Sequence, residues 1–330
     1  MNRWMLGAGL LLATVVSVLL GVRLGSVPLT TPQVLEALKG GGDPVIRDIV
    51  VQLRLPRVLL GVLVGGGLAI AGATFQALLR NPLAEPYILG ISGGASVGAV
   101  LVLAFGWVAA GSWALPLAAF AGALVAIVLV FRVATATGRA MDVRVLLLAG
   151  VVVAAFFSAC IAFILSISPA RTIQSAVLWI MGSLAGATWR GVFLTAVYTT
   201  PAVLLLVGLA RPLNLLAIGE ETAHHLGADV EKVKRTSLVV AALITASGVA
   251  VAGVIGFVGL IVPHAVRLLV GSDHRALLPL SFLAGAAFLT LADLAARLAL
   301  SPTEIPIGVI TAFIGVPFFL VLLRRSMTTP

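Results

Sequence analysis

Long hydrophobic blocks separated by short polar stretches are the main pattern along this chain. A helix that crosses about 30 Å of hydrocarbon needs roughly 20 apolar residues, because each residue adds about 1.5 Å. Lipid offers backbone polar groups no partner, so each block is predicted to be helical where it meets lipid. Ten blocks are predicted to span a membrane: Trp4–Gly25, Val58–Leu79, Ile88–Trp107, Ala114–Val133, Val145–Leu165, Val192–Ala210, Ser237–Ile255, Leu260–Val270, Leu277–Leu298 and Ile307–Leu323.

Two further segments do not fit the spanning pattern. Residues 171–189 contain a short apolar piece, Ala176–Leu184, which is predicted to be a half-helix that dips back into the bundle from the outer side. Residues 211–235 form the longest polar stretch and are interrupted by Gly219 and Gly227. This stretch is predicted to form two short helices at the inner membrane face, as a platform for a cytoplasmic partner.

The composition supports a membrane protein built as one domain over residues 1–330. Of the residues, 61% are hydrophobic and 10% are charged, whereas about a quarter of a typical soluble domain is charged. Glycines spaced four apart, as at Gly61/Gly65, Gly94/Gly98 and Gly182/Gly186, predict closely packed helices. The first apolar run is long for a signal peptide, and no small-residue cleavage site follows it, so an uncleaved span is favoured.

The distribution of basic residues predicts the orientation. With the N-terminus inside, thirteen of the 21 Lys and Arg residues lie on the cytoplasmic side, so both termini are predicted to be cytoplasmic. The net charge of +9 is therefore explained by topology rather than by nucleic-acid binding. The outer loop at residues 26–57 is an exception, because it carries Lys39, Arg47, Arg54 and Arg57. An acidic outer partner and an anchor to lipid headgroups explain this cluster equally well.

The chemistry-bearing residues are few. No G-x-x-x-x-G-K-[ST] sequence occurs, so this chain is not expected to bind ATP through a P-loop. Neither catalytic residues nor a metal site are predicted, since the adjacent His224 and His225 face different sides of a helix. Asp293 and Arg297 are spaced to pair on one helix face, and a partnered Asp293 argues against proton coupling.

Several long motifs carry a family resemblance. These are RLPR (54–57), AGATFQALLRNPLAEPYILGISGGASVG (71–98), GFVGLIVPHAVRLLVGSDHRALLP (256–279), ADLAAR (292–297) and EIPIGVITAFIGVPFFLVLL (304–323). In this order they resemble the FecCD/BtuC-like permeases of ABC importers for iron-siderophores, haem and cobalamin. The resemblance implies an all-α membrane fold with ten transmembrane helices per subunit, that of type II ABC importers. It also implies a homodimer around one central path, in the bacterial inner membrane.

Partners and residue roles follow from the same resemblance. Two ATPase subunits, carrying ATP and Mg, would bind on the cytoplasmic side, and a substrate-binding protein would dock outside; this chain itself would bind no cofactor. The path would be lined by the fifth and tenth spans and the Ala176–Leu184 piece. Residues 138–143 correspond to a gate region but match no motif there. His264 in VPHAVR is expected to serve packing or to make a polar contact to a helix end. The implied site residues are Arg54, Arg57 and Arg297 for docking, Gly219, Glu220, Glu221, Thr222, Ala223, His225, Leu226 and Gly227 for ATPase coupling, and Asn81, Pro82 and Leu83 for the cytoplasmic gate.

Alternative functions remain at this point. Iron-siderophore import is the first choice, because this substrate class is the commonest among similar sequences, and haem or cobalamin import by the same machinery is the alternative. A secondary carrier working alone would predict an inverted repeat between the halves, and none is evident. A membrane-embedded enzyme would predict clustered Asp, His or Arg at one interface, and no such cluster is evident either.

Overall fold

The computed structural model describes residues 3–107, 113–135 and 143–328, and within these ranges every element of secondary structure is a helix. Seven helices are long and apolar enough to cross a membrane, and three shorter apolar helices complete the set. The ten predicted spans therefore each match a helix. These helices are α1 (Arg3–Arg23), α4 (Leu55–Leu78), α5 (Ile91–Ala104), α6 (Ala114–Thr135), α7 (Val143–Ser166), α9 (Trp189–Gly208), α12 (Val230–Ala252), α13 (Val258–Val270), α14 (His274–Leu298) and α15 (Ile307–Thr328).

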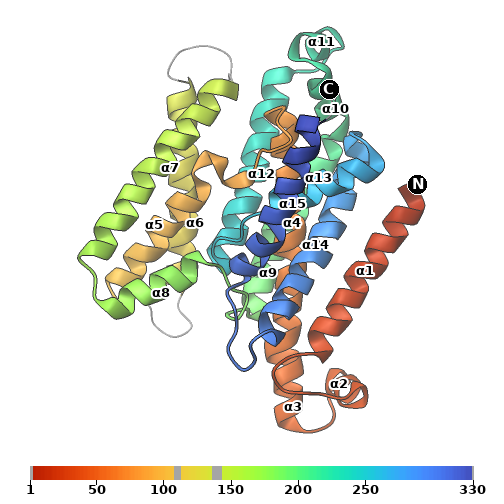
Figure 1. Cartoon of the computed structure of the whole chain (residues 1–330), viewed down its shortest axis with the longest axis vertical. Helices are drawn as coiled ribbons and strands as arrows, with labels where there is room; N and C mark the ends of the chain where they lie inside the picture. Colours follow the sequence, from red (N-terminus) through yellow and green to blue (C-terminus); the bar gives the residue numbers. More distant parts are fainter. Residues whose placement is uncertain (1–2, 108–112, 136–142, 329–330) are drawn as a thin grey trace.

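Helix α4 lies at the centre of the bundle and contacts α1, α9, α12, α13 and α14, while α5–α8 lie beyond α12 (Figure 1). Short helices occupy both ends. Both chain ends lie at the end that carries α10 and α11, and α2 and α3 lie at the opposite end (Figure 1). We call these the inner end and the outer end. The short helices are α2 (Thr31–Leu38), α3 (Pro44–Asp48), α8 (Ala170–Ile180), α10 (Ala210–Ile218) and α11 (Glu220–His225).

Small residues set the spacing of the central helices. A Cβ atom added to Gly65 of α4 would lie 2.3 Å from the carbonyl oxygen of Gly285 of α14, and one added to Gly94 of α5 would lie 2.3 Å from that of Gly122 of α6. Any side chain at these positions would force the helices apart. The close packing predicted from the glycine spacing is thus confirmed at Gly65 and Gly94, whereas Gly186 faces open space.

The predicted half-helix Ala176–Leu184 corresponds to α8, which lies a few residues earlier in the sequence. Helix α8 ends at Ile180, and the chain turns at Gly182, which has a φ of +75° that glycine adopts readily. The residues on either side of this turn form hydrogen bonds to α12 and α15 instead of continuing α8. The Ser183 amide donates to the Ala252 carbonyl at 2.8 Å, and the Gly308 amide donates to the Met181 carbonyl at 3.1 Å.

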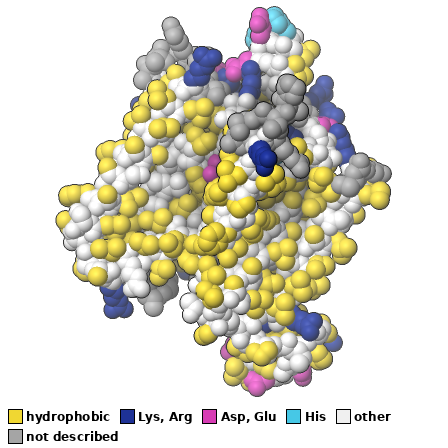
Figure 2. Space-filling model, viewed as in Figure 1, with side chains coloured by type: hydrophobic (Ala, Val, Ile, Leu, Met, Phe, Trp, Pro, Cys, Tyr) yellow, Lys and Arg dark blue, Asp and Glu magenta, His cyan; other side chains and the backbone are white. Residues whose placement is uncertain are grey.

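The surface divides into an apolar band and two polar ends. Figure 2 shows hydrophobic side chains over the middle of the visible face, with most charged side chains toward the ends. Large apolar residues such as Phe193 and Phe313 are 66% and 73% exposed. A soluble protein seldom exposes a continuous apolar band of this kind, so the band is typical of a protein embedded in a membrane.

Candidate functional site

The inner end presents α10 and α11 as a platform. Gly219, with φ 147° and ψ 146°, separates the two helices, and Gly227, with φ +83°, follows the end of α11. Both glycines adopt positive φ angles, which other residues rarely adopt. The side chain of Ala223 is fully buried and anchors α11, whereas Leu226 is 61% exposed. The predicted pair of short helices is therefore confirmed, and its outer surface is free for a partner.

Glu220, the first residue of α11, joins this platform to two long helices. Its carboxylate lies 2.7 Å from Lys234 Nζ of α12 and 3.6 Å from Arg80 Nη2, just beyond α4. The Lys234 side chain is 7% exposed, while those of Glu220 and Arg80 are 42% and 45% exposed. Glu220 therefore links α11 both to α12 and to the segment that begins at Arg80.

That segment contains the predicted gate residues. Arg80 has a φ of +46°, which ends α4, and the Leu83 amide donates to Asn81 Oδ1 at 2.9 Å to form a tight turn. Pro82 and Leu83 lie in a small apolar cleft with residues from two other helices, namely Leu260, Ile261 and His264 of α13 and Phe318 and Phe319 of α15. The structure thus brings Pro82 and Leu83 against α13 and α15, while Asn81 holds the turn before them. The other predicted gate segment is 138–143, of which residues 138–142 lie outside the described residues.

A broken helix beside the gate segment is held by side chains that the sequence reasoning missed. Helices α12 and α13 are separated by the non-helical residues 253–257. The Tyr87 hydroxyl donates to the Ile255 carbonyl at 3.1 Å and accepts from the Ile255 amide at 3.2 Å. Glu85 Oε1 accepts from the Phe257 amide at 2.7 Å. Non-helical backbone inside a membrane protein needs such partners. Burial raises the pKa of the Glu85 carboxyl, and the Phe257 N–H opposes that rise.

The outer end contains a charged network around Asp293. Arg57 donates to Asp293 Oδ1 at 3.0 Å through Nε and to both carboxylate oxygens of Glu304 at 2.9 Å. Asp293 also lies 3.1 Å from Arg297 Nε, which confirms the ion pair predicted from the spacing. The side chains of Asp293 and Arg297 are 3% and 5% exposed. One buried carboxylate therefore serves two arginines.

The three predicted docking arginines point into the chain itself. Arg54 donates to the carbonyl oxygens of Val22 and Arg23, and Arg297 donates to that of Gly21 at 3.2 Å. These carbonyls lie in the last turn of α1, where helical partners are missing and a cation is favourable. Arg54 is 6% exposed, so neither it nor Arg297 presents its guanidinium to an outer partner. The docking role stays a prediction, and among the three it fits best the partly exposed Arg57, paired with the exposed Glu304.

Comparison with known proteins fixes the family. The sequence profile of the FecCD transport family matches residues 12–325. The chain belongs to the FecCD transport family. The cobalamin import system permease protein BtuC of Halobacterium salinarum is 47% identical over 287 residues, which cover 87% of this chain and 76% of that protein. The vitamin B12 import system permease protein BtuC of Escherichia coli O157:H7 is 42% identical over 275 residues, which cover 83% of each chain.

A solved structure shows the same fold. A chain assigned to a metal-chelate type ABC transporter, captured in an inward-facing conformation, superimposes with a TM-score of 0.86 at 34% sequence identity. The match covers 97% of this FecCD-family chain and 98% of the other. The all-α, BtuC-like importer fold expected from the motifs is therefore confirmed, and the chain is an ABC importer permease.

Proposed function

We propose that this permease imports a metal chelate, with a corrinoid such as cobalamin as the first candidate. The two relatives named above, 47% and 42% identical, are both described as cobalamin or vitamin B12 permeases. Iron-siderophore import, favoured from the sequence on grounds of frequency, is the second candidate. It is supported by the likeness to a transporter of the metal-chelate type.

The proposed assembly has four kinds of contact. Two copies of this chain enclose one path, two ATPase subunits carrying ATP and Mg bind the inner end, and a substrate-binding protein docks on the outer end. The membrane is the bacterial inner membrane, with lipid around the apolar band and both termini in the cytoplasm. The observation that carries the proposal is the ion-paired Glu220, which ties the exposed platform to the gate segment.

In this proposal ATP-driven closure of the ATPases moves α11. Gly219 and Gly227 bound the moving unit, and Glu221, Thr222, His225 and Leu226 form its exposed surface. Because Glu220 pairs with Arg80, the movement reaches Asn81, Pro82 and Leu83 and shifts them against α13 and α15. A ligand biases such an equilibrium only through contacts that differ between the two states, and ATP and the docked binding protein both supply such contacts.

Docking at the outer end would use charge. Arg57 would exchange its pairing with Glu304 for a carboxylate on the binding protein, since Glu304 is 39% exposed and can move away. Lys39 and Arg47, both exposed near α2 and α3, would extend this surface. Opposite charges steer the encounter and fix its register.

Reconstitution tests the function. Vesicles containing this permease with its partner ATPase, and with its binding protein outside, should accumulate labelled cobalamin only when ATP is enclosed. A ferric siderophore offered in competition decides between the two cargoes. Accumulation by vesicles that contain the permease alone would overturn the assignment to an ATP-driven importer.

A further inference from the structure

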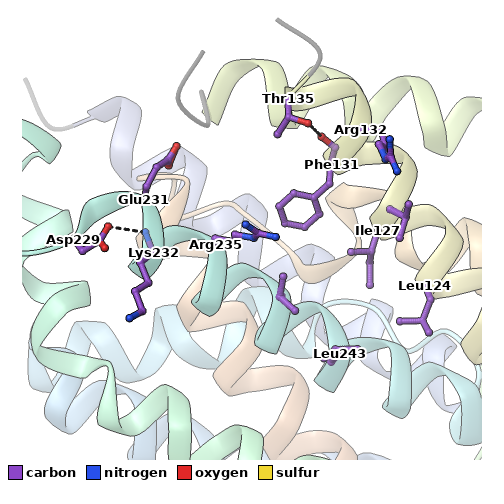
Figure 3. A pocket seen from close by; sticks show the side chains of 12 residues that line it. Leu124, Ile127, Phe131, Arg132, Thr135, Asp229, Glu231, Lys232, Arg235 and Leu243 are labelled. Atoms are coloured by element: carbon purple, nitrogen blue, oxygen red, sulfur yellow. Dashed lines mark hydrogen bonds between the residues drawn. The ribbon is translucent and has the colours of Figure 1, made fainter. Parts of the chain in front are cut away.

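A groove runs between α6 and α12 and opens at the inner end of the bundle (Figure 3). Its volume is about 900 Å³. Leu124, Val128 and Phe131 of α6 and Leu243 of α12 are among its apolar walls. Val128 and Leu243 are 55% and 38% exposed, so the groove is open along its length and not sealed by the chain itself.

The cationic and apolar parts of the groove are spaced along its two helices. Arg132 lies eight positions after Leu124 on α6, and Arg235 lies eight positions before Leu243 on α12. Since a helix rises 1.5 Å per residue, each apolar wall extends about 12 Å below its arginine. Half of the bilayer hydrocarbon is about 15 Å thick. An acyl chain along these walls would therefore fit within one leaflet, with the arginines at the level of its headgroup.

The two arginines are available to a ligand. Within the described ranges, neither Arg132 nor Arg235 has a side-chain hydrogen bond or ion pair. Asp229 accepts from the Lys232 amide at 3.1 Å and so caps α12, and Glu231 has an interaction of its own. Figure 3 shows Arg235 reaching toward Phe131 of α6, whereas Lys232 points away from that helix.

We propose that this groove binds an anionic phospholipid of the inner leaflet, with its phosphate between Arg132 and Arg235 and an acyl chain along the apolar walls. Basic pockets between helices at the cytoplasmic face suit anionic headgroups. A free phosphate would gain nothing from the walls at Val128 and Leu243. A soluble ATPase would not reach these walls either, because they lie at membrane depth.

The test measures lipid retained by the purified full-length protein. The protein is placed in mixed micelles with equal phosphatidylglycerol and phosphatidylcholine, and bound lipid per chain is counted by native mass spectrometry. The wild type should retain phosphatidylglycerol preferentially. The Arg132→Gln/Arg235→Gln variant should lose this preference by on the order of 20-fold, at about fivefold for each cation near the surface. The control Arg211→Gln/Arg275→Gln removes the same charge from exposed positions at the inner end and should retain it.

A second variant tests the walls without changing charge. Leu243→Trp should fill the deep part of the groove and lower phosphatidylglycerol retention while both arginines remain. Equal losses in the two double variants would overturn the proposal, as would unchanged retention in Arg132→Gln/Arg235→Gln. Displacement of the lipid by millimolar inorganic phosphate would identify a soluble anion site instead. If Arg132→Gln/Arg235→Gln retains phosphatidylglycerol but no longer dimerises or assembles with the ATPase, a polypeptide covers the groove, and the lipid proposal is overturned.

Discussion

The two ends of this permease use charge in opposite ways. At the outer end, Asp293 and Arg297 are nearly inaccessible, and each makes more than one interaction. At the inner end, Glu220 and Arg80 are more than 40% exposed and lie 3.6 Å apart. A buried, multiply bonded network opposes movement because every charge in it needs its partners. An exposed pair can break and re-form at little cost. The outer end is therefore suited to clamp α1, α4 and α14, and the inner end to transmit movement.

The largest expected effect comes from breaking the outer network. Asp293→Asn leaves Arg57 and Arg297 without their shared buried carboxylate, and unpaired buried charges cost about 3–5 kcal/mol. Thermal unfolding of the purified protein in detergent measures the loss. Glu304→Gln is the matched control, since Glu304 is 39% exposed and its pair with Arg57 is worth about 0–1 kcal/mol. Equal losses in both variants would break the contrast between buried and exposed pairs.

The sequence predicted which residues cross the membrane better than it predicted where each helix begins. Apolar blocks report the thickness of the hydrocarbon, so α12 was predicted to begin at Ser237, whereas it begins at Val230 with a polar first turn that lies outside the lipid. For the same reason, the predicted second span begins at Val58, although helical structure runs without a break from Pro44 to Leu78, with a π-helical stretch at 49–54. Hydropathy carries no information on these polar extensions.

Charge pairs were predictable only when they were local. The Asp293–Arg297 pair follows from helical spacing. Arg57 pairs with Asp293, 236 positions later in the sequence, and Glu220 of α11 pairs with Arg80, just beyond the end of α4. Both pairs depend on how the helices pack. Glu85 and Tyr87 were missed because their role depends on the break between α12 and α13. An isolated carboxylate close to an apolar span was the available signal for Glu85.

The buried carboxyl of Glu85, beside the gate segment, tests whether every charged group in the inner half contributes little to stability. Glu85→Leu removes the acceptor of the Phe257 N–H and leaves a buried donor unsatisfied, at a cost of about 1–3 kcal/mol. Glu85→Gln keeps a carbonyl oxygen at that position and should cost clearly less. The free energy of unfolding of the two variants measures the difference. Equal stability of Glu85→Leu and the wild type would show that water or another group replaces the carboxyl.

The coupling link should affect transport more than stability. Glu220→Gln removes both charge pairs at the start of α11. The exposed pair with Arg80 is worth about 0–1 kcal/mol, and the buried Lys234 keeps a further interaction of its own, so the unfolding free energy should fall less than in Asp293→Asn. ATP-driven uptake should fall at least about fivefold, which is the lower range of coupling between sites.

Glu221→Gln is the matched control for this link, because Glu221 is exposed and has no ion pair within the described chain. Its uptake, and its assembly with the ATPase, should stay close to those of the wild type. A loss of uptake in Glu221→Gln equal to that in Glu220→Gln would assign the effect to the ATPase contact. The ion pair with Arg80 would then carry no coupling.

The smallest effect should come from Asp273, which caps α14 at the inner end and pairs with Arg3 at 2.8 Å. The amide of Asn214, followed by the Arg275 N–H and Arg3, lowers the pKa of Asp273. Because the folded pKa is the lower one, this contribution is fully present above the unfolded value of about 3.9 and is lost as the pH falls through the folded pKa.

Asp273→Asn keeps the cap and removes the charge, so the wild type should exceed the variant in unfolding free energy by up to about 1 kcal/mol at neutral pH. The difference should vanish in acid and shrink with added salt, because Arg3 is 53% exposed. Asp43→Asn is the control, since Asp43 caps α3 through the Val45 amide and has no ion pair in the described ranges. A difference at Asp273 that persisted in acid would mean that side-chain hydrogen bonding holds this corner. The inner end would then resemble the outer end more closely than its exposed charges indicate.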